Sequence, residues 1–121
     1  MAKLLIVDDE LDVQQFAANF FRKRKFDVVT TGDGQKAVEL LEKEKPNLIL
    51  LDIKMNGMDG IETLRHIREK TKDIPVIMVT GRKPDEDNSC QKCEELGISG
   101  YIHKPLELSE LERVVLSLLT R

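Results

Sequence analysis

Three apolar runs along the chain show no alternation with polar residues, and two shorter candidates accompany them. The runs lie at residues 4–7, 47–51 and 76–79, and the shorter candidates at 27–30 and 100–102. A strand that is apolar at every position is typical of a sheet covered on both faces. The pattern therefore predicts five strands in a buried sheet.

The segments between these runs carry apolar residues at helical spacing, which gives each predicted helix one buried face. Residues 84–96 are the weak member, because Cys90, Cys93 and Leu96 are the apolar candidates there among many charged residues. We predict a weakly packed helix in that segment. The four clear stripes are Val13, Phe16, Ala17, Phe20 and Phe21; Ala37, Val38 and Leu41; Ile61, Leu64 and Ile67; and Leu108, Leu111, Val115 and Leu118.

Strand and helix alternate five times along 121 residues, a length that suits one domain with one core. Such alternation implies right-handed crossovers and a parallel sheet with helices on both faces. In these α/β sheets ligands bind outside the carboxyl ends of the strands. We therefore look for functional residues where the strands end.

The composition of the chain argues against nucleic acid and against a membrane as binding partners. The net charge is -3 and aromatic residues make up 4% of the chain, so there is neither a basic face for a phosphate backbone nor a set of rings for base stacking. No apolar run approaches the roughly 20 residues of a membrane span, and the N-terminus lacks the regions of a signal peptide. We expect a cytoplasmic protein that neither binds nucleic acid directly nor enters a membrane.

Cys90 and Cys93 are the two cysteines of the chain, and a disulfide framework needs more. Their spacing would also fit a redox or metal-binding Cys-x-x-Cys motif, but a zinc site would need two further ligands, and His66 and His103 lie in segments that do not look adjacent. We interpret the cysteines as small apolar residues on one helix face and both histidines as surface residues.

Charged and polar side chains follow four of the predicted strands. Carboxylates that converge at about 5 Å repel by about 3 kcal/mol per pair at an effective dielectric constant near 20, and three such pairs would rival the stability of the domain. Positive charge must therefore lie among them. The residues are Asp8, Asp9 and Glu10 after the first strand, Asp52 after the third, Thr80 after the fourth and Lys104 after the fifth.

Lys104 can supply one positive charge, and a divalent cation is the natural second. Carboxylate oxygens with no thiolate or imidazole nearby favour Mg²⁺. Taken alone, Asp8, Asp9 and Glu10 fit a helix N-terminus equally well, since carboxylates favour that end of the helix dipole. The convergence of Asp52 and Lys104 on the same edge favours the metal site.

These residues, in this order, resemble a response regulator receiver domain, the phosphoacceptor of two-component signalling. The resemblance covers the whole chain and implies one receiver domain over residues 1–121. It also implies a flavodoxin-like (βα)5 fold, a doubly wound parallel five-stranded sheet with strand order 2-1-3-4-5. The matching motifs are Asp8-Asp9 after an apolar strand, Asp52 after residues 48–51, the segment 55–60, Thr80 after residues 76–79, Gly100-Tyr101 and Lys104-Pro105.

By this resemblance Asp52 accepts a phosphoryl group from a phosphohistidine on a sensor histidine kinase or a phosphotransfer protein. Asp8, Asp9 and Asp52, with the backbone carbonyl of Lys54, would hold Mg²⁺. The cation would neutralise phosphoryl oxygens while positioning supplies most of the acceleration. Lys104 would pair with another phosphoryl oxygen as a point charge.

The resemblance also implies a switch. Thr80 would move toward the new phosphoryl group, and the Tyr101 ring would fill the space that it leaves. The Lys104-Pro105 bond is expected to be cis, as is usual in the family. The surface of the fourth helix, fifth strand and fifth helix would then change shape and so control a downstream protein or an attached output domain. The chain would be a monomer, or a weak dimer formed through this surface.

Two other functions compete with a phosphorylation switch. One is a receiver-like interaction module that is never phosphorylated, although such a module would not need the acidic set, Thr80 and Lys104. The other is a phosphohydrolase, whose Asp-x-Asp pattern would require an aspartate at position 10, where this chain has Glu10. We expect a signalling protein and not a turnover enzyme. Whether it stands alone or belongs to a longer chain stays open.

Overall fold

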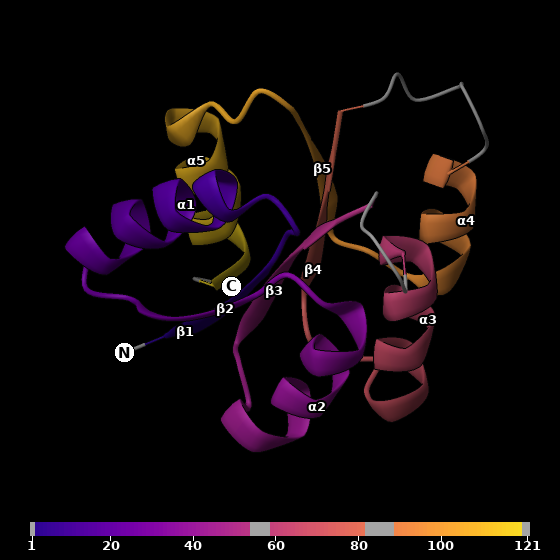
Figure 1. Ribbon diagram of the computed structural model, residues 1–121. Coiled ribbons are helices and arrows are strands. Elements are labelled where there is room, and N and C mark those ends of the chain that lie inside the picture. Colours follow the sequence, from indigo (N-terminus) through magenta and orange to yellow (C-terminus); the bar gives the residue numbers. More distant parts are fainter. Residues whose placement is uncertain (1, 54–58, 82–88, 120–121) are drawn as a thin grey trace.

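The computed structural model describes residues 2–53, 59–81 and 89–119, in which strands and helices alternate (Figure 1). The predictions for Lys54 and for the first part of the segment 84–96 fall outside the described residues. The strands are β1 (Lys3–Val7), β2 (Asp27–Thr31), β3 (Leu48–Asp52), β4 (Val76–Thr80) and β5 (Gly100–His103). The helices are α1 (Leu11–Lys23), α2 (Gly34–Glu44), α3 (Gly60–Lys70), α4 (Ser89–Leu96) and α5 (Leu108–Leu119).

The five strands form one parallel sheet with the order β2-β1-β3-β4-β5. This order confirms the predicted fold class and topology. The central strands β3 and β4 are buried at every position, as the uninterrupted apolar runs predicted. All five carboxyl ends lie on one edge of the sheet, because every pairing is parallel.

Helices cover both faces of the sheet. Figure 1 shows α1 and α5 together on one face and α2, α3 and α4 on the other. Each layer encloses its own apolar cluster: Ala17, Phe21, Leu111 and Val115 come from the helices of the first face, and residues of α2, α3 and α4 line the second. The alternating side chains of each strand feed the two clusters in turn.

The predicted stripe of α1 is partly wrong. Ala17 and Phe21 are buried as expected, but Phe16 is 53% exposed, and Gln14 takes an inward position instead. The physical reason is a hydrogen bond from the Gln14 side chain to the backbone oxygen of Asp8. Because the Gln14 side-chain amide finds a hydrogen-bond acceptor inside the protein, the buried face of α1 is turned away from Phe16.

The described part of α4 is anchored more firmly than its sequence predicted. Cys93 is fully buried in the cluster under α2, α3 and α4, with Leu96 packed against it. This burial confirms the interpretation of Cys93 as an apolar core residue. His66 and His103 lie at the surface, as predicted. Among the described residues, no helix has the length and apolar character required to span a bilayer.

Candidate functional site

The register of the sheet brings two aspartates to the same level at its carboxyl edge. Val7 pairs with Leu51 across β1 and β3, and each is followed directly by an aspartate. Asp8 and Asp52 therefore leave neighbouring strands side by side, and both are buried. Two buried carboxylates in such proximity repel each other unless a cation or a proton lies between them.

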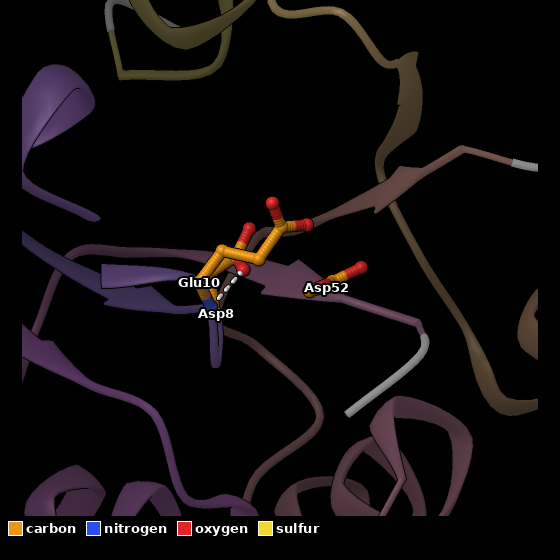
Figure 2. A group of neighbouring side chains, drawn as sticks. All are labelled: Asp8, Glu10 and Asp52. Carbon is orange, nitrogen blue, oxygen red and sulfur yellow. Dashed lines mark hydrogen bonds between the residues drawn. The ribbon is translucent and has the colours of Figure 1, made fainter. Parts of the chain in front are cut away.

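Glu10 joins this pair from the turn after β1. One carboxylate oxygen from each of Asp8, Glu10 and Asp52 lies within 4.8 Å of the other two (Figure 2). From the sequence, Glu10 was expected in the acidic cluster but not among the metal ligands. Asp9 lies in the same described turn and is not a member of this group of three.

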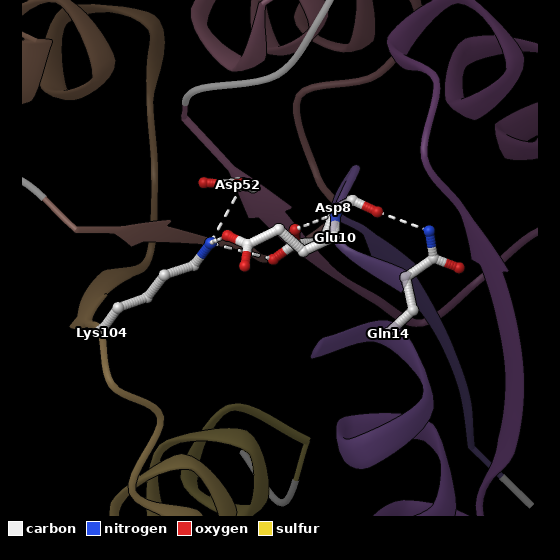
Figure 3. Close-up of polar contacts among 5 residues, drawn as sticks. All are labelled: Asp8, Glu10, Gln14, Asp52 and Lys104. Carbon is white, nitrogen blue, oxygen red and sulfur yellow. Dashed lines mark hydrogen bonds and ion pairs between the residues drawn. The ribbon is translucent and has the colours of Figure 1, made fainter. Parts of the chain in front are cut away.

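The Lys104 amine lies among the three carboxylates (Figure 3). Its Nζ is 3.0 Å from Glu10 Oε1, 3.2 Å from Asp52 Oδ2 and 3.3 Å from Asp8 Oδ2. Burial alone would lower the pKa of this amine, but the hydrogen bond to Glu10 and the charges of Asp52 and Asp8 outweigh it. The pKa of Lys104 is therefore raised, and the amine stays charged at neutral pH.

The turn after β1 is held by hydrogen bonds on both sides of Asp8. The Asp8 backbone N–H donates to the Thr31 oxygen at 3.0 Å, and Asp8 Oδ1 accepts from the Glu10 N–H at 2.9 Å. On the other side the buried Gln14 Nε2 donates to the Asp8 backbone oxygen at 2.5 Å (Figure 3). Gln14 thus supports the turn from the core, a contribution that the apolar pattern of the sequence does not reveal.

The backbone of Asp52 is packed against the start of α3. The Gly60 N–H donates to the Ile53 oxygen at 2.7 Å, and a Cβ atom at Gly60 would lie 2.0 Å from the Asp52 backbone oxygen. Real Cβ atoms do not approach backbone so closely. Only glycine allows the helix to begin here, and this close approach fixes the strand end that carries the Asp52 carboxylate.

Thr80 and Tyr101 lie on neighbouring strands and on the same face of the sheet. Thr80 is buried at the end of β4, and its backbone oxygen accepts from the Lys104 N–H at 2.8 Å. Side chains alternate along a strand, so Thr80 shares the face of Met78, which pairs with Tyr101. Tyr101 is half-buried against the cluster under α2, α3 and α4. The Lys104-Pro105 bond is cis, as expected.

The predicted site residues differ in how directly they contact Lys104. Asp8 and Asp52 meet directly at the Lys104 amine, and Thr80 reaches Lys104 through its backbone. The cluster offers hard carboxylate oxygens, which suit a hard divalent cation. The acidic group could therefore hold a metal ion.

Comparisons with known proteins agree with this geometry. Residues 4–116 match the family model of the response regulator receiver domain. The chain is 34% identical over 119 residues to the alkaline phosphatase synthesis transcriptional regulatory protein PhoP of Bacillus subtilis, covering 98% of this chain and 49% of that protein. It is 34% identical over 113 residues to sporulation initiation phosphotransferase F of the same organism, covering 93% of this chain and 90% of that protein.

The fold is shared with solved structures of the same kind. A two-component response regulator from Clostridium difficile superposes with a TM-score of 0.92 at 27% identity, covering 100% of this chain and 98% of that one. The chain spans about half the length of several curated relatives that it matches. The chain belongs to the response regulator receiver domain family, whose members are phosphorylation-activated signalling switches.

Proposed function

We propose that Asp52 is the phosphoacceptor of this chain and that residues 1–121 form a single receiver domain. The observation that carries the proposal is the position of the Asp52 carboxylate. It is buried at the carboxyl end of β3, and its Oδ2 lies 3.2 Å from the Lys104 amine. A carboxylate held in one orientation beside a fixed cation is prepared to act as a nucleophile.

The proposed reaction transfers a phosphoryl group from a phosphohistidine. A carboxylate oxygen of Asp52 attacks phosphorus, the new O–P bond forms as the P–N bond breaks, and the departing imidazole takes a proton from solvent. The Lys104 amine then pairs with a phosphoryl oxygen. This role is supported by the position of the amine among the carboxylates, where it already faces Asp52.

Asp8, Asp9 and Asp52 are the proposed ligands of Mg²⁺, with the Lys54 backbone carbonyl as a further ligand. The hard oxygen donors gathered at this edge support a magnesium site. When bound, Mg²⁺ would neutralise negative charge on the phosphoryl oxygens. Asp8 contributes in a second way, because its hydrogen bond from the Glu10 N–H fixes the direction of its carboxylate.

Thr80 and Tyr101 form the proposed switch pair. Their placement on one face of the sheet supports the proposal, since a shift of Thr80 toward Asp52 would open space on the face where Tyr101 lies. The change would reach the surface of α4, β5 and α5, which is also the proposed surface for weak dimerisation if the chain is not a monomer.

Receiver domains work with histidine kinases or phosphotransfer proteins and with output domains. We expect this chain to be cytoplasmic, with a sensor histidine kinase or a phosphotransfer protein as its donor and a downstream protein or an attached output domain as its target. Direct nucleic-acid binding by this domain and turnover catalysis are not expected. The acidic composition supports the first of these expectations.

The test is phosphorylation by a small phosphodonor. The purified chain is incubated with acetyl phosphate, with and without Mg²⁺, and its intact mass is measured. The proposal expects the mass of one phosphoryl group to appear only with Mg²⁺, to be absent in Asp52→Asn, and to persist in Asp12→Asn, which removes an exposed carboxylate of α1.

The same assay separates the competing functions. An interaction module would remain unlabelled under all conditions, and a wild-type chain that behaves so would overturn the proposal. A phosphohydrolase would release phosphate repeatedly from an ester substrate. Labelling that survives in Asp52→Asn would show that another residue accepts the phosphoryl group.

A further inference from the structure

Glu10 occupies the N-cap position of α1 but does not act as a cap. Its backbone is extended there, and its side chain makes no capping hydrogen bond to the helix. The shorter side chain of aspartate at this position would normally accept from the first N–H groups of the helix, but glutamate is not a preferred capping residue. The Glu10 side chain instead reaches Lys104, which is 94 residues away in the sequence.

The Lys104 amine has three carboxylate neighbours: it donates hydrogen bonds to Glu10 and Asp52 and forms an ion pair with Asp8. An ammonium group has three N–H donors, and the structure surrounds it with three carboxylate oxygens at 3.0, 3.2 and 3.3 Å (Figure 3). A phosphoryl oxygen can therefore pair fully with this amine only after one of the three carboxylates has moved away.

The three carboxylates differ in how easily they can leave. The side chains of Asp8 and Asp52 are each 4% exposed, whereas that of Glu10 is 62% exposed. A buried carboxylate that loses its cation would stay desolvated, which is costly. Released Glu10 would be hydrated, and its charge would move away from the incoming phosphoryl group.

We propose that Glu10 is a displaceable partner of Lys104. Glu10 binds the Lys104 amine in the unphosphorylated state and releases the amine to the phosphoryl group when Asp52 is phosphorylated. This inference rests on the proposed function and adds a positioning residue to it. Glu10 acts through Lys104, and it sets how strongly the site favours the phosphorylated state.

The experiment measures the affinity of the chain for beryllium fluoride, a mimic of the phosphoryl group, by ¹⁹F NMR. Mg²⁺ is kept saturating for every variant, as verified by titration, so that a changed metal affinity does not enter the result. Glu10→Gln keeps the shape of the side chain but replaces a charge-assisted hydrogen bond by a neutral one of about half the strength. Asp12→Asn is the matched control, because it removes an exposed carboxylate two residues away.

We expect Glu10→Gln to bind beryllium fluoride about fivefold more tightly than the wild type, since the competing partner of Lys104 is weakened. Glu10→Asp, whose shorter side chain retracts the carboxylate, should fall between the two, and Asp12→Asn should change the affinity less than about twofold. Acetyl phosphate should still label Asp52 in every one of these variants.

Weaker binding by Glu10→Gln would overturn the inference, because it would mean that Glu10 stays in place and orients Lys104 for the phosphoryl group. An affinity equal to that of Asp12→Asn would overturn it as well, since the effect would then be one of general charge. Both results leave the proposed function intact when Asp52 is labelled. A wild type that is neither labelled nor bound by beryllium fluoride would remove both proposals.

Discussion

Replacing Lys104 by methionine removes a positive charge and nearly preserves the length of the side chain. The amine contacts Asp8, Glu10 and Asp52 at 3.0 to 3.3 Å. At an effective dielectric constant near 20 each contact corresponds to about 5 kcal/mol of attraction, which the cost of burying the amine largely offsets. The contact with exposed Glu10 is screened and contributes less than about 1 kcal/mol.

The net effect comes from the two aspartates that lose their cation. Breaking a buried ion pair by removing one partner costs about 3 to 5 kcal/mol, and since Lys104 keeps some contact with solvent we expect Lys104→Met to lose about 3 kcal/mol. That loss lowers the melting temperature by about 10 °C in a domain of this size. Urea unfolding at neutral pH, followed by circular dichroism, measures it. Lys36→Met, at an exposed position of α2, is the control and should change stability by less than about 0.5 kcal/mol.

Magnesium distinguishes this explanation from a simple packing defect. The carboxylates that lose Lys104 are those that could hold a metal ion. A ligand that binds the folded state adds about 1.4 kcal/mol of stability for each tenfold rise of its free concentration above its Kd. Lys104→Met should bind Mg²⁺ more tightly, because no amine competes, so its stability deficit should shrink as Mg²⁺ is added. A variant as stable as the wild type without Mg²⁺, or a deficit that Mg²⁺ does not change, would refute the reasoning.

Further predictions concern the supports of the site and its pH dependence. Gly60→Ala should destabilise the chain by more than about 3 kcal/mol in urea unfolding, because its Cβ would overlap the Asp52 backbone, whereas Gly81→Ala, whose Cβ meets open space, should cost less than about 1 kcal/mol. Gln14→Leu should cost about 1 to 2 kcal/mol, because the Asp8 oxygen loses its donor, and calorimetry should show weaker Mg²⁺ binding; unchanged binding would separate Gln14 from the site. Asp8→Asn should weaken Mg²⁺ binding by about tenfold or more in the same titration. The pKa of Lys104 is raised from 10.5, so its stabilising contribution is complete below pH 10.5 and declines only as the pH rises through the higher value. The stability difference between the wild type and Lys104→Met should therefore stay constant from pH 7 to about pH 10, and a difference that falls within this range would contradict the shift.

The fold could be predicted from the sequence because its buried parallel strands are apolar at every position. Runs such as residues 48–51 leave little doubt about a strand covered on both faces. The strand ends then placed Asp8, Asp52 and Lys104 on one edge, since parallel strands share a direction. These features depend on local pattern and simple topology, and the structure confirms the convergence.

The details that could not be predicted depend on long-range contacts. Phe16 fits the apolar period of α1, but the period alone does not reveal that Gln14 finds a partner inside the protein. Glu10 places a carboxylate at the N-terminus of a helix, where the helix dipole favours it, and only the folded chain brings Lys104 close enough to bind that carboxylate. A polar side chain changes its environment whenever a distant residue offers a better partner.

The most direct measurement locates the phosphoryl group on the chain. After reaction with acetyl phosphate and Mg²⁺, reduction with borohydride converts an aspartyl phosphate to homoserine, and peptide mass spectrometry then identifies the position. We expect homoserine at position 52 and unmodified aspartate at Asp8 and Asp9. A phosphoryl group found on any other residue, with Asp52 unchanged, would contradict the assignment of Asp52 as the phosphoacceptor.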